Sequence, residues 1–351
     1  MPTTKIIAVD TLQKQLLRLF EAEGLNQEHA QQMTSGLLET SLKGIDTHGL
    51  RLLPLYIREL REGRAVVNPE MKIDKKTVSM ASMDAGGALG IVAGYKAVQT
   101  CIDMSRESGF GLISVSNSNH FGAASVYGDQ VAQAGMIGMV SSNAAPRVVP
   151  FNGLEKLFGT DPWCFTSPIS KTDVFSLDMA TSQVAYAKVK EKLRKQEALP
   201  AGWCKGVANI APTHFSEVAG LLPLGGHKGQ GLSMMVQILS GLLANSLLDH
   251  ELQHLDEEPF NQSRNISHFM LAIDIQRFLE LDTFHARMQE WIATIKGSQK
   301  AGSETIKIAG EVEQETRKKR LKSGIPFTDV EWRDITALFD TTDTELVSEI
   351  S

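Results

Sequence analysis

The sequence predicts an α/β fold in which helical segments at both ends flank a central region of alternating strands and helices. Roughly the first 64 residues carry apolar side chains at helical spacing, as at Leu12, Leu16 and Leu19. From about Val78 onward, short apolar runs alternate with helical segments, which is typical of α/β layers. Near the end, the stretches GEVEQETRKKRLKSG and FTDVEWRDITALFD return to a helical pattern.

Three helices are expected in the N-terminal segment. The first has Asp10 or Thr11 as its N-cap. The second runs from about residue 27 to 43 and ends at Gly44, a C′ glycine. The third begins near Pro54, because proline suits the first turn of a helix. His48 therefore lies at the corner between the second and third helices.

The central region supplies the predicted strands and the helices between them. The strands are expected at VSMASM, GLISVSNS, MIGMVSSN, WCFTSP, VFSLDMA and HFMLAIDI. Helices are expected at about residues 91–106, 124–134, 183–195 and 229–248.

Charge and cysteine content narrow the functional class. The 351 residues carry a formal net charge of −6 with lysine and arginine interspersed, which argues against nucleic acid or an anionic membrane as the main partner. The cysteines, Cys101, Cys164 and Cys204, form no CxxC pair, so a disulfide framework and a cysteine zinc site are not expected. The N-terminus lacks a signal-peptide core. The longest apolar stretch, at about residues 232–248, is broken by polar residues. We therefore expect a cytoplasmic protein.

Two histidines fall at predicted chain corners. His48 follows Asp46 and Thr47, and His120 follows the strand GLISV and a run of small polar residues. Histidine can act as an acid or base near neutral pH, and the carboxyl end of a strand is where α/β proteins place ligands. The alternatives are a solvated histidine at a capped helix corner and a loop of Asx turns.

Two further stretches suit an anion. In SLDMATSQVA a strand is expected to end at Asp178, and Thr181 or Ser182 can cap the following helix, whose N-terminus could hold a pyrophosphate. In PLGGHKGQG the glycines allow close approach of a ligand, and Lys228 supplies a charge at a helix start. The alternative for the first is an ordinary βα turn. Neither a GxGxxG fingerprint after a strand, a Walker A sequence nor a G-x-S-x-G elbow occurs, and His48, His120, His214 and His227 show no HxxxH or HxH spacing that would support a metal site.

Taken together and in order, these stretches resemble the malate/L-lactate dehydrogenase family of NAD(P)-dependent oxidoreductases. The resemblance covers about residues 12–335. It rests on GIDTHGLRLLPLYIRELREG, SNSNHFGAASVYGDQVAQAGMIGMV, VVPFNG, FGTDP, LDMATSQVAYAK, LPAGW and LLPLGGHKGQGLSMMVQILSGLL.

The resemblance implies a non-Rossmann, sulfolactate-dehydrogenase-like fold: a mixed sheet with helices, plus a helical domain from the N- and C-terminal segments. Residues 1–122, completed by 285–351, would form the helical substrate domain, and 123–284 the α/β domain that binds NAD or NADP. The implied activity is hydride transfer between a 2-hydroxy acid and its 2-oxo acid in a homodimer. Alternatives within the same fold are a non-catalytic protein and a reductase of imines or diketo acids.

The resemblance also implies roles for individual residues. His48 is the expected proton donor. In ureidoglycolate dehydrogenase, however, the histidine that matches His120 is assigned as the proton acceptor. The implied cofactor contacts are Ala144, Ser176, Asp178, Met179, Ala180, His227, Lys228, Gly310 and Glu311. No metal is implied.

The chain departs from the family pattern at five places, one of which is Ala309 in place of the usual proline before Gly310 and Glu311. Thr47 replaces the usual serine before the histidine and keeps its hydroxyl. Leu52 stands where many members carry an arginine, so Arg51 becomes the candidate anchor for a substrate carboxylate, because a guanidinium binds a carboxylate through two hydrogen bonds. The segment 204–214, with Gly206 in place of an aspartate, is altered, and Asp161 replaces the common asparagine of GTNP.

Overall fold

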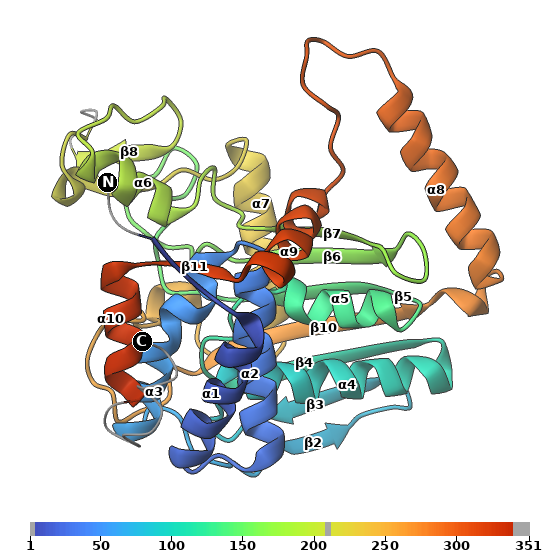
Figure 1. Cartoon of the computed structure of the whole chain (residues 1–351), viewed down its shortest axis with the longest axis horizontal. Coiled ribbons are helices and arrows are strands. Elements are labelled where there is room, and N and C mark those ends of the chain that lie inside the picture. The colour runs from blue at the N-terminus through green and yellow to red at the C-terminus, as the bar shows by residue number, and fades with distance from the viewer. Residues whose placement is uncertain (1–3, 208–211, 340–351) are drawn as a thin grey trace.

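A seven-stranded mixed sheet forms the centre of the molecule (Figure 1). The computed structural model describes residues 4–207 and 212–339. In spatial order the strands of the sheet are β2 (Lys72–Lys75), β3 (Met80–Asp84), β4 (Phe110–Ser118), β10 (Ile266–Asp274), β5 (Met136–Ser142), β6 (Trp163–Pro168) and β7 (Val174–Met179). Strands β3 and β4 are parallel, and the other neighbouring pairs are antiparallel. The predicted mixed α/β sheet is therefore confirmed.

Helices cover both faces of the sheet. Helices α4 (Gly90–Ser108) and α5 (Ser125–Gln133) pack on one face, where Val140 of β5 is fully buried. The next residue, Ser141, points to the other face and its hydroxyl lies 3.0 Å from that of Ser240. Ser240 belongs to the π-helical turn at Gln237–Leu242 that continues helix α7 (His227–Val236). The alternation along β5 thus follows the two-residue period of a strand.

The N- and C-terminal segments build one helical layer beside the sheet. Its elements are α1 (Val9–Ala22), α2 (Gln27–Leu42), α3 (Leu53–Arg61), α10 (Asp329–Phe339) and the pair β1 (Thr4–Ile7) and β11 (Ile325–Thr328). Leucines of α1 and α2 share one apolar core with Trp332 and Ile335 of α10. This packing explains why the helical pattern appears at both ends of the sequence.

The sheet continues across residue 122, where we expected a boundary between domains. Strand β4 ends before this residue, at Ser118, whereas its neighbour β10 begins far after it, at Ile266. The two strands are nevertheless hydrogen-bonded, with Ile113 paired to Met270. The strand pairing therefore gives no edge at residue 122. The division into residues 1–122 with 285–351, and 123–284, stays a prediction.

Several element boundaries differ from the prediction. Helix α1 begins at Val9 after an extended Ala8, so neither Asp10 nor Thr11 is its N-cap; Asp10 lies in the first turn instead, where its charge suits the helix dipole. Helix α6 (Tyr186–Arg194) begins later than residue 183, and Thr181 and Ser182 do not cap it. Their hydroxyls are engaged elsewhere, by Ser233 at 2.9 Å and by the Val184 carbonyl at 2.9 Å.

The helix expected at residues 229–248 is also shorter than predicted. It begins at His227, changes to the π-helical turn after Val236 and ends at Leu242. Asn245 then adopts a positive φ of 50°, which an asparagine tolerates and a continuing helix does not.

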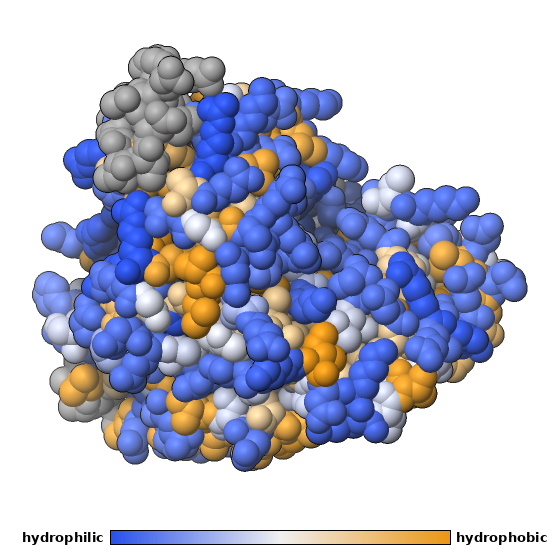
Figure 2. All heavy atoms as spheres, turned by 90° about the horizontal axis from the view of Figure 1, so that it is seen from below, coloured by the Kyte–Doolittle hydropathy of each residue, from blue (hydrophilic) through white to orange (hydrophobic). Residues whose placement is uncertain are grey.

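The remaining elements lie at the periphery. They are the pair β8 (Cys204–Gly206) and β9 (Val218–Leu221), the helix α8 (Leu281–Gly297) and the helix α9 (Glu311–Ser323). Helix α8 stands apart from the rest of the molecule at the right of Figure 1. Seen from below, the surface is largely hydrophilic, with apolar side chains in small separate patches (Figure 2). Among the described helices, none has the length and apolarity that crossing a membrane requires.

Candidate active site

A cleft of about 290 Å³ lies at one edge of the sheet. Strands β4, β5 and β7 run in the same direction, because β10 is antiparallel to both β4 and β5 and β6 is antiparallel to both β5 and β7. Their carboxyl ends therefore meet at this edge, the usual place for ligands in α/β sheets. We call this space the cleft; its walls come from the corner 45–52, the loops after these three strands, the start of α6 and residues 253–255.

His48 lines the cleft from the corner between α2 and α3. The hydroxyl of Thr47 lies 2.9 Å from its Nδ1, which leaves Nε2 without a hydrogen-bond partner among the described residues. Two residues earlier, Asp46 is held from α9, with Arg320 Nη2 donating to its Oδ2 over 3.0 Å. The corner thus fixes the ring and keeps one nitrogen open for a ligand.

Gly49 allows the corner that carries His48 to pack closely against α2. A Cβ at this position would overlap the hydroxyl of Ser41 in α2, and that hydroxyl accepts a hydrogen bond from the Leu50 N–H over 2.9 Å. A side chain larger than hydrogen would push the corner away from α2. The glycine after the histidine therefore sets how closely His48 approaches the sheet.

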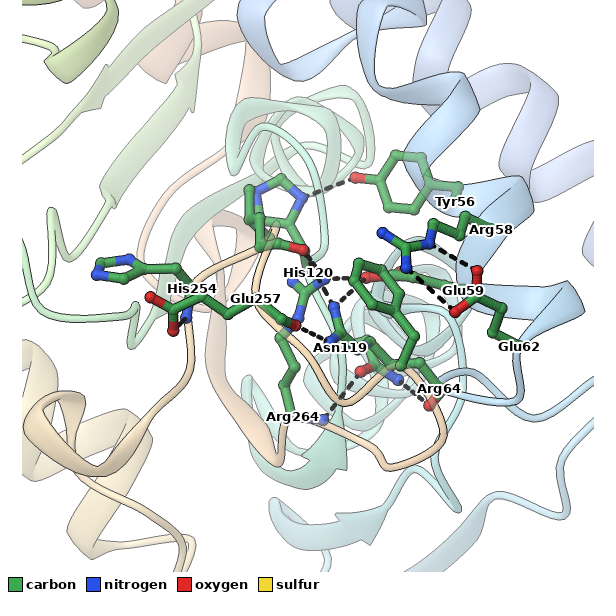
Figure 3. Close-up of polar contacts among 12 residues, drawn as sticks. Tyr56, Arg58, Glu59, Glu62, Arg64, Asn119, His120, His254, Glu257 and Arg264 are labelled. Atoms are coloured by element: carbon green, nitrogen blue, oxygen red, sulfur yellow. Dashed lines mark hydrogen bonds and ion pairs between the residues drawn. The ribbon is translucent and has the colours of Figure 1, made fainter.

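His120 lies opposite His48, with the ring centroids 5.6 Å apart. Its Nδ1 lies 2.7 Å from the hydroxyl of Tyr56, which projects from α3 toward it (Figure 3). The two histidines thus come from the helical layer and from the loop after β4, and the structure brings them together.

The two rings differ in electrostatic environment. His48 is exposed to the open cleft, but protein atoms crowd around it and the resulting desolvation lowers its pKa, while the charge of Asp178 acts in the opposite direction. Burial lowers the pKa of His120 well below its ordinary value, and repulsion of a protonated ring by the neighbouring His48, Arg264 and His268 lowers it further. His120 is therefore neutral near pH 7, and His48 is the better proton donor.

A buried ionic network supports the Tyr56 side of the cleft (Figure 3). Glu59, one turn after Tyr56 on α3, pairs with Arg264, and both side chains are fully buried. Arg64 and Arg264 donate to the carbonyl of Leu255, each over 3.0 Å. Leu255 lines the cleft, so this network fixes the loop that forms one of its walls. We had not predicted the network from the sequence, although a glutamate on the apolar face of the helix 53–61 is a signal for it.

A second cavity of about 280 Å³ adjoins the cleft and shares Ile45 and Asp178 with it. Ser176 and Gly310 line this cavity, and a Cβ on Gly310, whose φ is +90°, would lie 3.1 Å from the Ser176 backbone. Glu311 lies next to it, and its carboxylate accepts a hydrogen bond from the Ile308 N–H over 3.0 Å. The structure thus brings the 176–178 and 309–311 stretches together.

The residues present fit an extended ligand with a flat ring. The wall of the cleft is made of small side chains, namely Gly122, Ala123, Ala124, Ala144, Ala145, Ala180, Ala185 and Ala187. Such side chains leave room for a planar group near the two histidines. The adjoining cavity shares Ile45 and Asp178 with the cleft, so the two form one trough that could hold a ligand longer than a single ring.

Other predicted residues do not line either cavity. His227 and Lys228 begin α7 and are exposed; the turn before them lies beside residues 181–183, with the Leu224 N–H donating to the Thr181 carbonyl over 2.9 Å. Met179 ends β7 without lining the cleft. Part of the altered segment 204–214 forms β8 beside a different cavity, and its residues 208–211 lie outside the described residues.

Arg51 also lies outside the cleft. Its Nε is 2.8 Å from Glu331 of α10, and a second contact joins Nη2 to Asp46 at 3.7 Å. The neighbouring Leu52 lines the cleft instead. The structure therefore puts an apolar side chain where we had expected an arginine, and it engages Arg51 with carboxylates of the protein.

Arg147 is a cation of the cleft that the sequence had not singled out. It lies in the loop after β5, and its guanidinium carbon is 3.9 Å from the centre of the Tyr186 ring. Within residues 4–207 and 212–339, no carboxylate lies within ion-pair distance of it. His254 lines the same wall, and burial together with the charge of Arg147 lowers its pKa. In the part of the chain that the structure describes, no cluster of three His, Cys, Asp or Glu side chains is arranged to hold a metal.

Comparison with known proteins gives a consistent result. A model of the malate/L-lactate dehydrogenase family matches residues 7–336. Malate dehydrogenase from Pyrococcus abyssi is 37% identical over 331 residues, covering 91% of this chain and 90% of that protein. Ureidoglycolate dehydrogenase (NAD(+)) from Escherichia coli is 26% identical and covers 92% of this chain and 93% of its own. The structure of sulfolactate dehydrogenase from Methanocaldococcus jannaschii superposes with a TM-score of 0.90 at 27% identity, over 96% of this chain and 97% of that one.

Proposed function

The chain belongs to the malate/L-lactate dehydrogenase family of oxidoreductases, and from this premise we propose that it interconverts a 2-hydroxy acid and its 2-oxo acid with NAD or NADP. The observation that carries the proposal is the pair of histidines, 5.6 Å apart, in a cleft lined by small side chains at the carboxyl ends of three strands. Hydride transfer to or from the substrate carbon is the chemistry that a bound nicotinamide supplies.

His48 is the proposed acid and base. When a carbonyl is reduced, its oxygen gains a proton, and an imidazolium within hydrogen-bond reach can deliver it. His48 lines the cleft, and because Thr47 occupies Nδ1, Nε2 is the nitrogen that is available to a substrate there. The charge of Asp178 favours the protonated ring. In the oxidation direction the neutral ring accepts the proton from the hydroxyl.

His120 is proposed to orient the substrate as a neutral hydrogen-bonding group. The Tyr56 hydroxyl at Nδ1 fixes its ring, and Tyr56 itself stays protonated because burial raises its pKa well above the ordinary value. The Tyr56 hydroxyl can then donate to Nδ1, which places a proton on Nε2 of the neutral ring. A neutral His120 with an Nε2–H can donate a hydrogen bond to the substrate oxygen.

The cofactor is proposed to lie along the trough formed by the cleft and the adjoining cavity. Ala144, Asp178 and Ala180 line the cleft, and Ser176 and Gly310 line the continuation. Met179 and Glu311 adjoin these positions in the chain. His227 and Lys228 lie outside both cavities, so we propose that they act through the turn that contacts Thr181. The choice between NAD and NADP stays open.

Fluorescence titration with NADH and NADPH, followed by turnover with a panel of 2-oxo acids, tests the proposed function. We expect binding of at least one cofactor and its oxidation by at least one 2-oxo acid. If the cofactor binds and the protein reduces a cyclic imine or a diketo acid but no 2-oxo acid, the substrate belongs to one of those two classes instead. Absence of binding to either cofactor would favour a non-catalytic member of the fold.

Arg147, in preference to Arg51, is proposed to anchor the substrate carboxylate. Its guanidinium lines the cleft without an ion pair among the described residues, whereas Arg51 lies outside the cleft and pairs with Glu331. A guanidinium binds a carboxylate through two parallel hydrogen bonds, and the Tyr186 ring beneath it restricts its orientation.

Arg147→Ala is expected to raise KM for a 2-oxo acid roughly 10- to 150-fold, because a hydrogen bond to a charged group contributes about 1.5–3 kcal/mol. Arg147→Lys keeps the charge without the fork and should give an intermediate KM. Steady-state kinetics measure both effects. Lys156→Ala removes an exposed positive charge from outside the cleft and is the matched control. An unchanged KM in Arg147→Ala with a large rise in Arg51→Ala would return the role to Arg51. A loss of cofactor affinity alone would assign Arg147 to a cofactor phosphate.

We also propose that the protein is a homodimer in which α8 contacts the second copy. Of the described residues of α8, only His285 is buried, and Trp291 is 59% exposed. A single helix gains most of its stability from packing of an apolar face, so a helix standing away from its own chain needs a partner. Sedimentation equilibrium distinguishes a dimer from a monomer.

The three free cysteines agree with the proposed cytoplasmic location.

A further inference from the structure

Two aspartates face each other in the interior beneath the cleft. Asp161 and Asp249 are both completely buried and both contact Gly159: its N–H donates to Asp249 Oδ2 over 2.6 Å, and a Cβ added to it would lie 2.6 Å from Asp161 Oδ1. Asp161 precedes β6 and has a positive φ of 39°; Asp249 begins a short helical turn after the π-helical segment.

Asp249 acts as a multiple acceptor. Its Oδ1 accepts a hydrogen bond from the Ala144 N–H over 3.1 Å and its Oδ2 accepts one from the Gly159 N–H over 2.6 Å. The side-chain amide of Gln237 donates to Oδ1 as well. Such donors stabilise the ionised form of a carboxyl group. Asp249 is therefore the partner that carries the negative charge.

Asp161 has no comparable donors. Among the described residues, no hydrogen bond of normal length and angle reaches either of its oxygens, and the donors near it are the Ser233 hydroxyl and its own N–H. The nearby hydroxyl of Ser233 is engaged by the hydroxyl of Thr181, 2.9 Å away. Among residues 4–207 and 212–339, no lysine, arginine or histidine pairs with either aspartate. Two unshielded carboxylates cannot both be ionised in such a place, because each would be desolvated and would repel the other.

We propose that Asp161 is a protonated carboxylic acid that donates its proton to Asp249, and that this shared proton positions the floor of the cleft. Asp161 is thus a positioning residue, acting through Asp249 on the loop that contains Ala144. Thr160 and Pro162, on either side of Asp161, line the cleft together with Ala144. The pair joins the loop after β5, the segment before β6 and the α7 region through one hydrogen bond.

An aspartate at residue 161 makes this contact titratable. An asparagine at residue 161 would donate the same hydrogen bond through its amide at every pH, whereas an aspartate donates only while it is protonated. The titratable groups that face the pair, among the described residues, are the two carboxyls themselves. The other neighbours are neutral: the Ser233 hydroxyl, the Gln237 amide and the N–H groups of Ala144 and Gly159.

The pKa directions agree with this geometry and give the sign of the pH dependence. Burial and the neighbouring Asp249 raise the pKa of Asp161 well above its ordinary value, and burial raises that of Asp249 to about 6. The folded state then binds more protons than the unfolded state above about pH 4. Stability contributed by the pair is complete below that pH and is lost as pH rises through the folded pKa.

Equilibrium unfolding in denaturant, measured from pH 6 to pH 8.5, is the first test. We expect the unfolding constant of the wild type, relative to Asp161→Asn, to rise by at least about tenfold over this range, since one extra bound proton gives up to tenfold per pH unit. Asp161→Asn keeps the donor and, as an asparagine, tolerates the positive φ. A pH-independent ratio would overturn the proposal.

The second test observes the proton directly. Infrared spectra of the protein with isotopically labelled aspartate should show a protonated carboxylic acid band at pH 7 that Asp161→Asn removes. Asp249→Asn leaves one oxygen to accept three N–H donors and should destabilise the protein at every pH. Asp103→Asn, on the exposed face of α4, is the matched control, and its spectrum should equal that of the wild type. The same band in Asp161→Asn would refute the assignment.

The effect on the cleft rests on the proposed function and has its own readout. With a productive 2-oxo acid, kcat/KM of the wild type should fall at alkaline pH relative to Asp161→Asn, which should hold its value longer. A protein that turns over no 2-oxo acid would fail this arm alone, while the unfolding and infrared results would still decide whether Asp161 is protonated. Equal pH profiles of the two proteins would show that the pair does not act on the cleft.

Discussion

His48→Ala is expected to lower kcat for 2-oxo acid reduction by roughly 10²–10⁴-fold, the range for loss of a general acid. The substitution removes the ring whose open Nε2 faces the substrate space. Affinity for the cofactor should change little, because Thr47 and Asp46 hold the rest of the corner. Steady-state kinetics and cofactor fluorescence titration measure the two quantities separately.

The pH profile gives this prediction a direction. Reduction needs the imidazolium, and burial lowers the pKa of His48 below its ordinary value of 6.5. The rate of reduction should therefore fall as pH rises through a pKa below 6.5, while the rate of oxidation rises over the same interval. Asp178→Asn removes the charge that favours the protonated ring, so it should move both profiles to lower pH.

His120→Ala is the comparison that could contradict this assignment. A neutral orienting group should affect KM and kcat without moving the acidic limb of the profile. If His48→Ala keeps its kcat and His120→Ala loses both activity and the pH dependence, the proton role belongs to His120. Tyr56→Phe then separates the two further, because it leaves the His120 ring in place but removes its 2.7 Å hydrogen bond.

The positions of the two histidines could be predicted because each sits in a short local pattern. His48 follows a helix that ends at Gly44, whose φ is +80°, and His120 follows the end of a predicted strand. Local patterns fix where a chain turns, and the carboxyl ends of strands that run in the same direction share one edge of the sheet. These two facts predicted the chain corners, and the family resemblance implied that both histidines serve one site.

The residues that were missed depend on pairings between segments far apart in the sequence. Arg147 lies in the cleft because β5 ends beside the start of α6, which supplies Tyr186. Arg51 is engaged by Glu331, some 280 positions later in the chain. A one-residue difference near a helix start turns a side chain by about 100°, so Leu52 faces the cleft and Arg51 faces α10. The spacing of residues within a short stretch of sequence does not reveal partners from a distant segment.

Glu59→Ala is expected to destabilise the protein by about 3–5 kcal/mol, because removing one partner of a buried ion pair leaves an uncompensated charge. Glu59 and Arg264 are both fully buried, and a second guanidinium, that of Arg64, lies 4.0 Å from Glu59. Burial raises the pKa of Glu59 and lowers that of Arg264, so desolvation outweighs attraction at both partners. Equilibrium unfolding in denaturant measures the loss.

Glu62→Ala is the matched control on the same helix. Glu62 forms an ion pair with Arg58, but its side chain is 45% exposed, and exposed pairs contribute about 0–1 kcal/mol. A loss in Glu59→Ala no larger than that in Glu62→Ala would show that water enters and solvates the two arginines. If the large loss is found, the loop containing Leu255 should loosen as well, because Arg64 and Arg264 both donate to its carbonyl. Hydrogen exchange at residues 253–257 should then rise in Glu59→Ala and stay unchanged in Glu62→Ala, which would connect a buried charge on α3 to the wall of the cleft.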